Sequence, residues 1–448
     1  MNAFFRSGAG IGAGSTQGES GMAQAKHPRG LYVLFFTEMW ERFSFYTMFA
    51  VFVLYMDEAM HLPSGQLHNT YAFYSGFVYF TPLLGGWLAD RWLGCRKAVL
   101  IGGGLMALGH FGLFLGTYAL FYPALVLLVL GNGFFKPNIS TMVGNLYSQN
   151  SPLRDSAFNI FYMGINVGAF IAPLSAGWLH HNVGFRWAFF SAAAGMVLST
   201  VILVVFNRTI AHADGSRALE EGEREVELEP TEERQRIWAL MVVFGIVIIF
   251  WTAYMQYGDV LMFWARDYTA PFFGRWDVPA EWYQSVNPIF IILFTPLVVW
   301  LWGALNRRGR EPSTGAKMLY GMILTAVAFL IMVQAARLNA ASGEPVGASW
   351  LISFYAVITL SELFLSPMGL SYVTRVSPPR MRSTMMGLWF VASGVGGYLS
   401  GFLGHWWESL PHATYFLVTV AASLVAVVLM ALSIKTINHA EAASEKSV

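Results

Sequence analysis

The chain has 448 residues, of which 56% are hydrophobic and 12% are charged, and its formal net charge is +1. Its mean hydropathy is +0.51. Soluble domains carry about 25% charged residues, so this composition indicates a protein that crosses a membrane several times and excludes an ordinary soluble enzyme. The small net charge gives no argument for a nucleic-acid partner. The single cysteine, Cys95, excludes an internal disulfide framework and a metal site made of cysteines alone.

Residues 1–30 are polar and rich in glycine and serine, which predicts a disordered tail. A glycine-rich stretch at 8–14 has no strand before it, so we do not interpret it as a phosphate-binding loop. Twelve apolar segments follow, each long enough to span a bilayer as a helix. We place them at about 31–56, 70–90, 97–119, 121–147, 156–180, 186–206, 237–265, 281–305, 316–337, 348–374, 382–406 and 412–434.

The segment 207–236 is too polar and charged to span, and we interpret it as a cytoplasmic linker. It separates an N-terminal six-helix bundle at 31–206 from a C-terminal six-helix bundle at 237–435, with a short tail at 436–448. The predicted fold is therefore all-α and membrane-embedded. Two six-helix halves joined by a central loop are the layout of the major facilitator fold, whose substrates bind near the midplane between the halves.

The positive residues predict how the chain is oriented. Of the 27 Lys and Arg residues, 21 fall in the two termini and the loops on their side, four fall on the opposite side, and two lie within spans. Cytoplasmic segments carry the excess of positive charge, so both termini are expected in the cytoplasm of a cell (inner) membrane. One chain supplies a complete path between its two halves, so we expect a monomer in the bilayer.

The first span carries three ionised residues, Glu38, Glu41 and Arg42, which share one helix face. Each charge costs at least about 2.5–3.5 kcal/mol at the bilayer centre, and such residues mark ion and substrate pathways. Arg42 can hold one carboxylate through a bidentate fork. The other carboxylate is then desolvated beside a like charge, and both conditions favour its protonated form. The cluster is either a proton-coupling element or a fully paired, permanently charged group.

Two further spans carry single charges, Lys136 in the fourth and Glu362 in the tenth. A buried ammonium needs an anion, and Glu362 is the natural partner from the other half. This pair would be either a static contact that fixes the packing or a switchable one that opens when the acid gains a proton or a substrate ammonium. We favour the switchable pair.

The loop after the second span, residues 85–97, contains Gly86, Asp90 and Arg91. It resembles the cytoplasmic loop motif of the major facilitator superfamily, which implies a conformational role, although an ordinary positive loop is the simpler alternative. Glycine there permits close approach of helices. Asp90 can pair with Arg91 or accept hydrogen bonds from the N–H groups at a helix end.

Residues 38–46 read Glu-x-x-Glu-Arg-Phe-x-Phe-Tyr, and residues 161–168 in the fifth span read Phe-Tyr-x-x-Ile-Asn-x-Gly. Both are similar to signatures of the proton-dependent oligopeptide transporter (POT) family of the major facilitator superfamily. Shorter likenesses lie at 132–138, 284–288 and 361–367. The resemblance covers most of residues 30–435.

The resemblance implies a symporter in which the proton gradient drives uptake of di/tripeptides or similar zwitterions by alternating access. In that family the first-span cluster couples to protons, and the lysine and glutamate form a latch on the cytoplasmic side. The glutamate also meets the substrate amino terminus. Protons are then the only coupling ion, and no cofactor or metal is expected.

The predicted substrate cavity is polar and aromatic, since hydroxyls and amides hold peptide backbones while aromatic faces accept varied side chains. Each residue taken alone could be an ordinary helix contact, but the resemblance assigns Asn166 and Asn287 to the peptide backbone and amino terminus. The candidate substrate-binding residues are Tyr46, Tyr79, Asn166, Gln256, Asn287, Glu362 and Trp389.

The chain departs from the family at an expected gate. Phe49 stands where peptide-transporting members usually carry arginine, and Met255 stands where its glutamate partner is usual. This predicts an apolar outer gate and removes the family's usual cation for the peptide carboxylate. The alternative substrates are therefore an amino-acid derivative, an amine or an anion. Asp259 is either a second proton or amine site, or an acid at the outer helix end beside Arg266.

Other classes of function receive less support. The sequence has no nucleophile–base pair, no metal-ligand spacing on a helix and no phosphate loop, so we expect no enzyme. A transporter-like sensor would need a signalling domain, and the tail is short. We interpret His110, His180 and His181 as structural, and we expect the second span, placed at 70–90, to lack the histidine found in animal members of the family.

Overall fold

The computed structural model describes residues 27–147, 153–214, 229–271, 277–378 and 381–446. The predicted N-terminal tail, apart from its last residues, and the middle of the predicted linker lie outside the described residues. Within those bounds the chain is almost entirely helical, because long apolar segments can satisfy their backbone groups inside a membrane only by forming helices or closed barrels.

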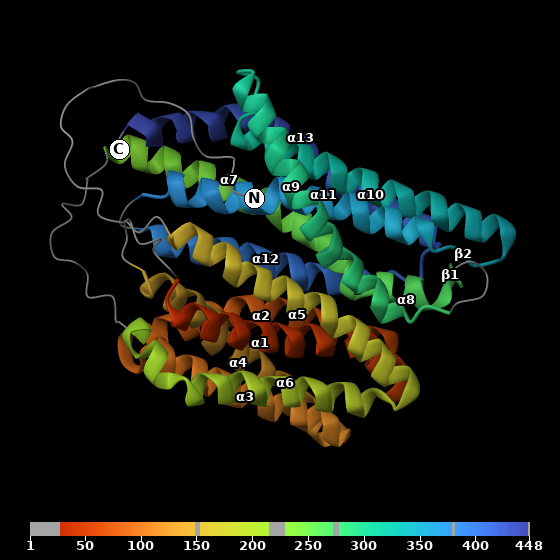
Figure 1. The fold of residues 1–448 in the computed structure, drawn as a ribbon. Helices are drawn as coiled ribbons and strands as arrows, with labels where there is room; N and C mark the ends of the chain where they lie inside the picture. Colours follow the sequence, from red (N-terminus) through yellow and green to blue (C-terminus); the bar gives the residue numbers. More distant parts are fainter. Residues whose placement is uncertain (1–26, 148–152, 215–228, 272–276, 379–380, 447–448) are drawn as a thin grey trace, which may run out of the picture.

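The helices follow the predicted order (Figure 1). The α-helices are α1 (Arg29–Leu54), α2 (Ser64–Leu88), α3 (Cys95–Leu115), α4 (Tyr118–Asn145), α5 (Arg154–Asn182), α6 (Phe185–Val205), α7 (Pro230–Tyr254), α8 (Val260–Asp267), α9 (Val286–Arg307), α10 (Thr314–Ser342), α11 (Ser349–Val376), α12 (Arg382–Gly404) and α13 (His412–Lys446). Short π-helical turns extend α1 and α2 as η1 (Tyr55–Ala59) and η2 (Ala89–Leu93). The 3-10 segments are η3 (Asn207–Asp214), η4 (Met255–Gly258) and η5 (Ala280–Ser285). Two short strands, β1 (Thr269–Ala270) and β2 (Val346–Gly347), pair in parallel.

Ten segments of the described chain are long and apolar enough to cross a membrane. One of them joins α7, η4 and α8, and another joins η5 and α9. Helix α1 is not among the ten because every 18-residue stretch of it holds Glu38, Glu41 and Arg42. Helix α2 is rich in glycine, serine and tyrosine, which lower its hydropathy. With these two, the described residues contain the twelve predicted crossings.

The crossings form two bundles (Figure 1). Helices α1–α6, coloured red to yellow-green, form one bundle, and α7–α13, coloured green to blue, form the other. Small residues let helices approach closely without side chains between them. A Cβ on Gly168 of α5 would lie 2.4 Å from the Met39 carbonyl oxygen of α1. This contact fixes the height and rotation of the helix that carries the first-span charges.

The two bundles meet along α2 and α12, which lie in the middle of the molecule (Figure 1). The hydroxyl of Ser75 donates to the Gly397 carbonyl at 2.9 Å across this contact. A Cβ on Gly401 would lie 2.6 Å from Ala72 backbone atoms. A second contact joins α5 to η5 and α9. The halves therefore touch through glycine-bearing surfaces, which suits elements that slide or rock against each other.

Several helix ends differ from the predicted ones. Helix α2 begins at Ser64, before the predicted start at about 70, so it contains His68, whereas the expectation that this span lacks the histidine of the animal members stays a prediction. Helix α7 begins at Pro230, inside the predicted linker, and α13 continues to Lys446. Hydropathy misses such turns because they are polar, although the helix continues through them. At the start of the linker, Asp214 of η3 pairs with Arg96 at 3.4 Å.

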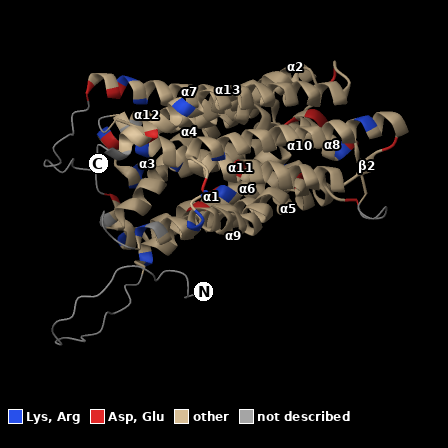
Figure 2. Ribbon diagram, turned by 90° about the horizontal axis from the view of Figure 1, so that it is seen from above, with Lys and Arg blue, Asp and Glu red and all other residues tan. Residues whose placement is uncertain are grey.

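The charged residues that Figure 2 colours on the ribbon gather at the two ends of the molecule, and few lie along its middle, some of them near α1. We call the end that holds the α1–α2, α5–α6 and α11–β2 connections the outer end, following the orientation expected from the Lys and Arg distribution. The opposite end is called the inner end.

Candidate functional site

A cavity of about 280 Å³ lies between the two bundles. Its wall takes side chains from α1, α2, α4 and α5 of the first half and from α7, η4, η5, α9, α11 and α12 of the second. Four of the lining residues are acidic or basic: Glu38, Arg42, Lys136 and Glu362. This placement near the midplane between the halves is where transporters of this layout bind their substrates.

The α1 cluster is formed as predicted and is buried. The Arg42 guanidinium donates to both oxygens of Glu41, at 2.5 and 2.7 Å, in a bidentate fork. A third, longer hydrogen bond of 3.4 Å reaches the side-chain oxygen of Asn132, whose amide is itself held by the Val78 carbonyl. The guanidinium also lies 5.0 Å from the centre of the Phe45 ring. Glu41 is therefore the bidentate partner of Arg42 in this conformation.

Glu38 is the carboxylate that remains available. One of its oxygens lies 3.3 Å from Nε of Arg42, and the other is buried and has no hydrogen-bond partner among the described residues. Glu38 lines the cavity, whereas Glu41 does not. A buried polar atom without a partner calls for a functional explanation. Of the two acids, Glu38 is the one that can exchange a proton with the cavity.

Lys136 lies on the same wall, with Nζ 5.1 Å from the centre of the Tyr79 ring. The predicted Lys136–Glu362 ion pair is not formed in this conformation. The cation rests on an aromatic face, a contact worth about 2 kcal/mol when desolvated, and faces the cavity. The role of the two residues as a latch stays a prediction, since a switchable pair is open in part of its cycle.

Glu362 stands on the opposite wall and is held by neutral donors. Its Oε2 accepts hydrogen bonds from the Tyr254 hydroxyl at 2.7 Å and the Asn287 amide at 3.0 Å. Asn287 also donates to the Thr359 hydroxyl at 3.0 Å. No cation in the described residues neutralises this carboxylate. It is therefore positioned to receive a positive group that enters the cavity.

Five of the other candidate residues line the cavity, and their role in substrate binding stays a prediction: Tyr46, Tyr79, Asn166, Asn287 and Trp389. Gln256 does not line the cavity, which corrects its prediction as a cavity residue, because its amide faces the interior of the second half. It donates to Ser400 and accepts from the Tyr415 hydroxyl at 2.6 Å. The chain turns from α-helix to 3-10 helix at Met255, which rotates Gln256 away from the face that the α-helical period predicts.

Further cavity residues were not among the candidates: Tyr162, Tyr254, Tyr257 and Gln284. Tyr162 and Gln284 stand inside the two motifs at 161–168 and 284–288, so the motifs themselves were the signal. Tyr254 could have been found from the helical spacing that puts it on one face with Trp251, which also lines the cavity, whereas Tyr257 lies in the 3-10 segment, where the α-helical period fails. The cavity is thus more aromatic than predicted.

The predicted apolar gate, Phe49 and Met255, is buried on the outer side of the cavity. The Phe49 ring centre lies 5.9 Å from that of Tyr71 and 5.7 Å from that of Tyr257. The Tyr71 hydroxyl donates to the Met255 carbonyl at 2.8 Å. A Cβ on Gly258 would lie 2.2 Å from the Phe49 ring. The Phe49 ring therefore packs directly against Gly258 of the other half and closes the outer side of the cavity.

A buried ion pair lies beyond this apolar layer. His68 Nδ1 of α2 lies 3.0 and 3.1 Å from the two carboxylate oxygens of Asp259, and both residues are almost fully buried. The interpretation of Asp259 as an acid beside Arg266 is wrong, because Arg266 binds Asp57 and Glu58 at 2.7 and 2.8 Å instead. Both sets of contacts join the two halves, so the outer end is closed.

The loop motif lies at the inner end and away from the cavity. Asp90 and Arg91 are exposed, and the Arg91 guanidinium lies 5.8 Å from the centre of the Trp87 ring. Gly86 faces Pro137 of α4 across ordinary van der Waals distance. These positions agree with a location outside the substrate site, while the conformational role stays a prediction.

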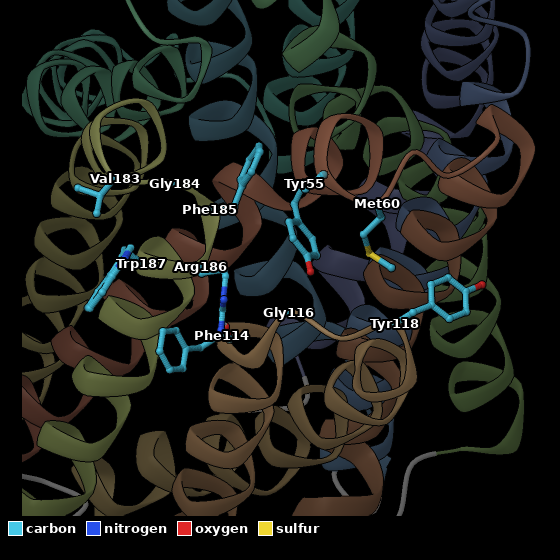
Figure 3. Close-up of a pocket in the computed structure, with 11 residues that line it drawn as sticks. Tyr55, Met60, Phe114, Gly116, Tyr118, Val183, Gly184, Phe185, Arg186 and Trp187 are labelled. Carbon is cyan, nitrogen blue, oxygen red and sulfur yellow. The ribbon is translucent and has the colours of Figure 1, made fainter.

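A separate hollow opens at the outer end of the first half alone (Figure 3). Its aromatic lining includes Tyr55, Phe185 and Trp187. Its one guanidinium, Arg186, already donates to the Phe114 carbonyl at 2.8 Å and lies over that ring. All its lining residues belong to the first half, and no described residue of the second half lines it, so opening and closing of the two halves would not gate it. We do not assign it as the transport site.

A family model described as the POT family matches residues 96–219 and 220–417. The peptide transporter YePEPT of Yersinia enterocolitica is 33% identical over 467 residues, covering 87% of this chain and 90% of that relative. The chain belongs to the POT family. A di-/tripeptide transporter of Lactococcus lactis subsp. cremoris is 31% identical over 476 residues, which cover 90% of this chain and 94% of that relative.

Solved POT structures have the same fold. A peptide transporter POT in complex with alafosfalin superposes with a TM-score of 0.84 at 30% identity, covering 92% of this chain and 96% of that one. A POT transporter in complex with 5-aminolevulinic acid gives 0.83 at 26% identity, covering 92% and 97%. These matches confirm the major facilitator fold. They also establish this POT chain as a multi-pass membrane transporter and not an enzyme.

Proposed function

We propose that this POT protein is a proton-coupled symporter that takes up small peptides or peptide-like zwitterions by alternating access. The observation that carries the proposal is the division of charge across the cavity. Arg42 and Lys136 stand on the first wall, and Glu362 stands alone on the second. The names of the relatives, a peptide transporter and a di-/tripeptide transporter, support a peptide substrate.

A zwitterion matches this division of charge, with its ammonium toward the second wall and its carboxylate toward the first. Its ammonium would replace the missing counter-charge of Glu362, beside the hydroxyl of Tyr254 and the amide of Asn287. Its carboxylate would face Lys136, whose ammonium lies against the Tyr79 ring and forms no salt bridge within the described residues. Lys136 therefore supplies a cation that the gate lacks, since Phe49 stands where peptide-transporting members usually carry arginine. Asn166 and the tyrosines supply neutral groups for the peptide backbone.

Proton coupling follows from the charge of the first wall. With Glu38 and Glu41 ionised, their two charges balance those of Arg42 and Lys136. A proton on Glu38 leaves this wall with one net positive charge, which favours the substrate carboxylate. Proton and substrate then bind together, which is the thermodynamic requirement for symport. No other coupling ion or cofactor enters this scheme.

The scheme includes an orientation and an assembly state. We infer that both termini face the cytoplasm, so that the closed outer end faces the outside of the cell. In this orientation the conformation is the one that has sealed off the outside. The monomer is the functional unit in this proposal, because both walls of the cavity come from one chain.

A second candidate substrate is a small amino-acid derivative. It is favoured by the cavity volume of about 280 Å³ and by the apolar gate of Phe49 and Met255. A POT neighbour has been solved with 5-aminolevulinic acid, which is also a zwitterion with separated charges. The two candidates share the same recognition chemistry and differ in length and in the presence of a peptide bond.

The first test is uptake of labelled dialanine into proteoliposomes that contain only this protein, with and without an inward proton gradient. We expect accumulation with the gradient and only equilibration without it. Competition by unlabelled dialanine and by 5-aminolevulinic acid then ranks the two substrate classes. A folded protein that neither accumulates nor exchanges either compound would contradict the proposal.

The apolar gate gives an independent prediction. Gly258→Ala places a methyl group where the Phe49 ring now lies, and overpacking of this kind costs about 1–3 kcal/mol. Because only the outer-closed state contains the contact, we expect the variant to disfavour closure and to slow uptake. The initial uptake rate of dialanine measures this effect.

Gly245→Ala is the matched control, since a Cβ on Gly245 of the same crossing meets nothing within 4 Å. Its uptake rate should stay near that of the wild type. The double variant Phe49→Ala with Gly258→Ala removes the clash and should recover part of the rate. Equal rates for Gly258→Ala and Gly245→Ala would show that this contact does not form during transport.

A further inference from the structure

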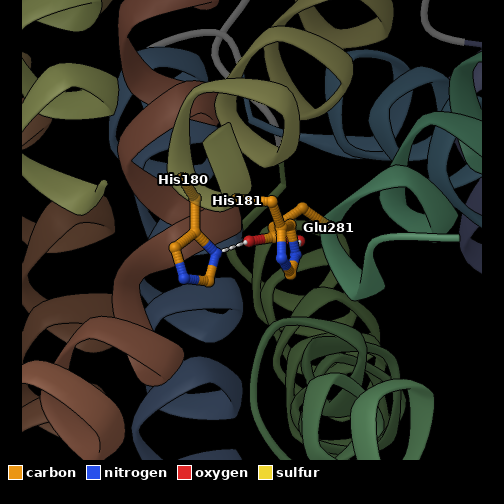
Figure 4. Close-up of side chains that lie close together, drawn as sticks. All are labelled: His180, His181 and Glu281. Atoms are coloured by element: carbon orange, nitrogen blue, oxygen red, sulfur yellow. Dashed lines mark hydrogen bonds and ion pairs between the residues drawn. The ribbon is translucent and has the colours of Figure 1, made fainter. Parts of the chain in front are cut away.

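Three potential metal ligands meet at the outer end, where the two halves touch (Figure 4). His180 and His181 lie in the last turn of helix α5 of the first half, and Glu281 belongs to η5 of the second half. Their ligand atoms all lie within 4.8 Å of one another. The α5–η5 contact is one of the joints between the halves, so whatever occupies this cluster bears on closure of the outer end.

The contacts within the cluster leave capacity for a cation. His180 Nδ1 lies 2.6 Å from Oε1 of Glu281, and His181 Nε2 lies 3.5 Å from Oε2. The Glu281 side chain is fully buried, yet its Oε2 has no hydrogen-bond partner in the described residues. This oxygen points toward His181 in Figure 4. A buried carboxylate oxygen without a partner is a costly arrangement that a bound cation would relieve.

The surroundings are also suited to a cation. A pocket of about 470 Å³ reaches the cluster and gives it a route to the outside, and the imidazole of His181 is half exposed. Glu58 lies 3.5 Å from Nε2 of His180 and could supply a further oxygen. Arg266, which lines the same pocket, is already shared between Asp57, Glu58 and Asp267.

We propose that His180, His181 and Glu281 form a site for a divalent transition metal, with Zn²⁺ as the best fit, and that the metal holds the outer end closed. Two imidazoles and one carboxylate with an open position are a zinc-like donor set. Alternating access requires α5 and η5 to part, and a metal that binds both elements opposes this movement. A ligand that binds only the closed state multiplies the ratio of closed to open protein by 1 + [ligand]/Kd, which is about 100-fold at one hundred times Kd.

The effect on transport rests on the proposed function, whereas metal binding does not, so the two are measured separately. Calorimetric titration of the purified, tag-free protein with zinc chloride should show one ion bound per chain. His181→Asn removes one ligand from an exposed position and should weaken binding by roughly 10–100-fold, the loss that even a supporting group of a metal site causes. The conservative Glu281→Gln should weaken it as well.

His61→Asn is the matched control, because His61 is an exposed histidine of the same end. It has a positive φ of 51°, which asparagine tolerates. Its zinc affinity should equal that of the wild type. Absence of a bound zinc ion in the wild type, or equal affinities in the wild type and His181→Asn, would overturn the metal site.

The second experiment measures the effect on transport. Zinc chloride is added to the solution outside proteoliposomes while they exchange dialanine. Inhibition that His181→Asn relieves and His61→Asn does not is the expected result. Calorimetric binding without inhibition would overturn the proposed hold on the outer gate and leave the site intact. Binding in a protein that exchanges no substrate would contradict the transport proposal and not the metal site.

Discussion

Glu38→Gln is expected to uncouple substrate movement from the proton gradient. One pH unit is worth about 1.4 kcal/mol, which supports about tenfold accumulation when one proton moves with each substrate. Glutamine has the shape of the protonated acid but carries no proton to exchange. We therefore expect the accumulation ratio of dialanine to fall from about ten to about one.

Binding and exchange should survive this change. Glutamine leaves the first wall with the net positive charge that Arg42 and Lys136 supply against Glu41, which is the charge state proposed to receive the substrate carboxylate. Dialanine affinity should be equal to or higher than that of the wild type, and exchange of labelled for unlabelled dialanine should continue. The measurement is accumulation and exchange in the same proteoliposome preparation.

Two other carboxylates make this result specific. Glu344→Gln, in an exposed loop of the outer end, should accumulate dialanine like the wild type. Glu41→Gln removes the partner of a buried guanidinium, which costs about 3–5 kcal/mol, so it should lower the unfolding temperature, whereas Glu38→Gln should not. Tenfold accumulation by Glu38→Gln would show that the coupled proton binds at another residue, and Asp259 would be the next candidate.

The sequence predicted the α1 cluster correctly because charges in an apolar span stand out without any knowledge of the fold. It could not say which acid Arg42 holds, since Glu38 and Glu41 are both within its reach along a helix. That choice depends on the cavity, which leaves Glu38 at its edge and Glu41 behind the guanidinium. The motif supplied the residues, and only the structure shows which acid pairs with Arg42 and which one lines the cavity.

Errors arose where the fold changes the local pattern. The first turns of α2 are polar, so hydropathy placed the start of this span after His68, although Asp259 from the other half buries that side chain. Gln256 was misplaced because the α-helical period was extended through a 3-10 turn. The unpaired state of Lys136 and Glu362 belongs to one conformation, and a sequence encodes every conformation of the cycle.

Substitution of Glu362 and Lys136, combined with blocked peptides, is expected to reveal how the substrate is oriented. Glu362→Gln removes the anion proposed to meet the substrate ammonium. Loss of one partner of a buried charge pair costs about 2–5 kcal/mol, so dialanine affinity should fall about 30-fold or more. N-acetyl-dialanine has no ammonium, and its already weak affinity should not fall further.

The reciprocal experiment uses the opposite end of the substrate. Lys136→Gln should lower the affinity for dialanine by a similar factor. The affinity for dialanine amide, which has no carboxylate, should not change. Because each variant serves as the control for the other, a general defect in folding or gating would weaken all three ligands together in both variants. If the two variants instead exchange their ligand preferences, the substrate lies in the cavity in the reverse direction, with its ammonium toward the α1 acids.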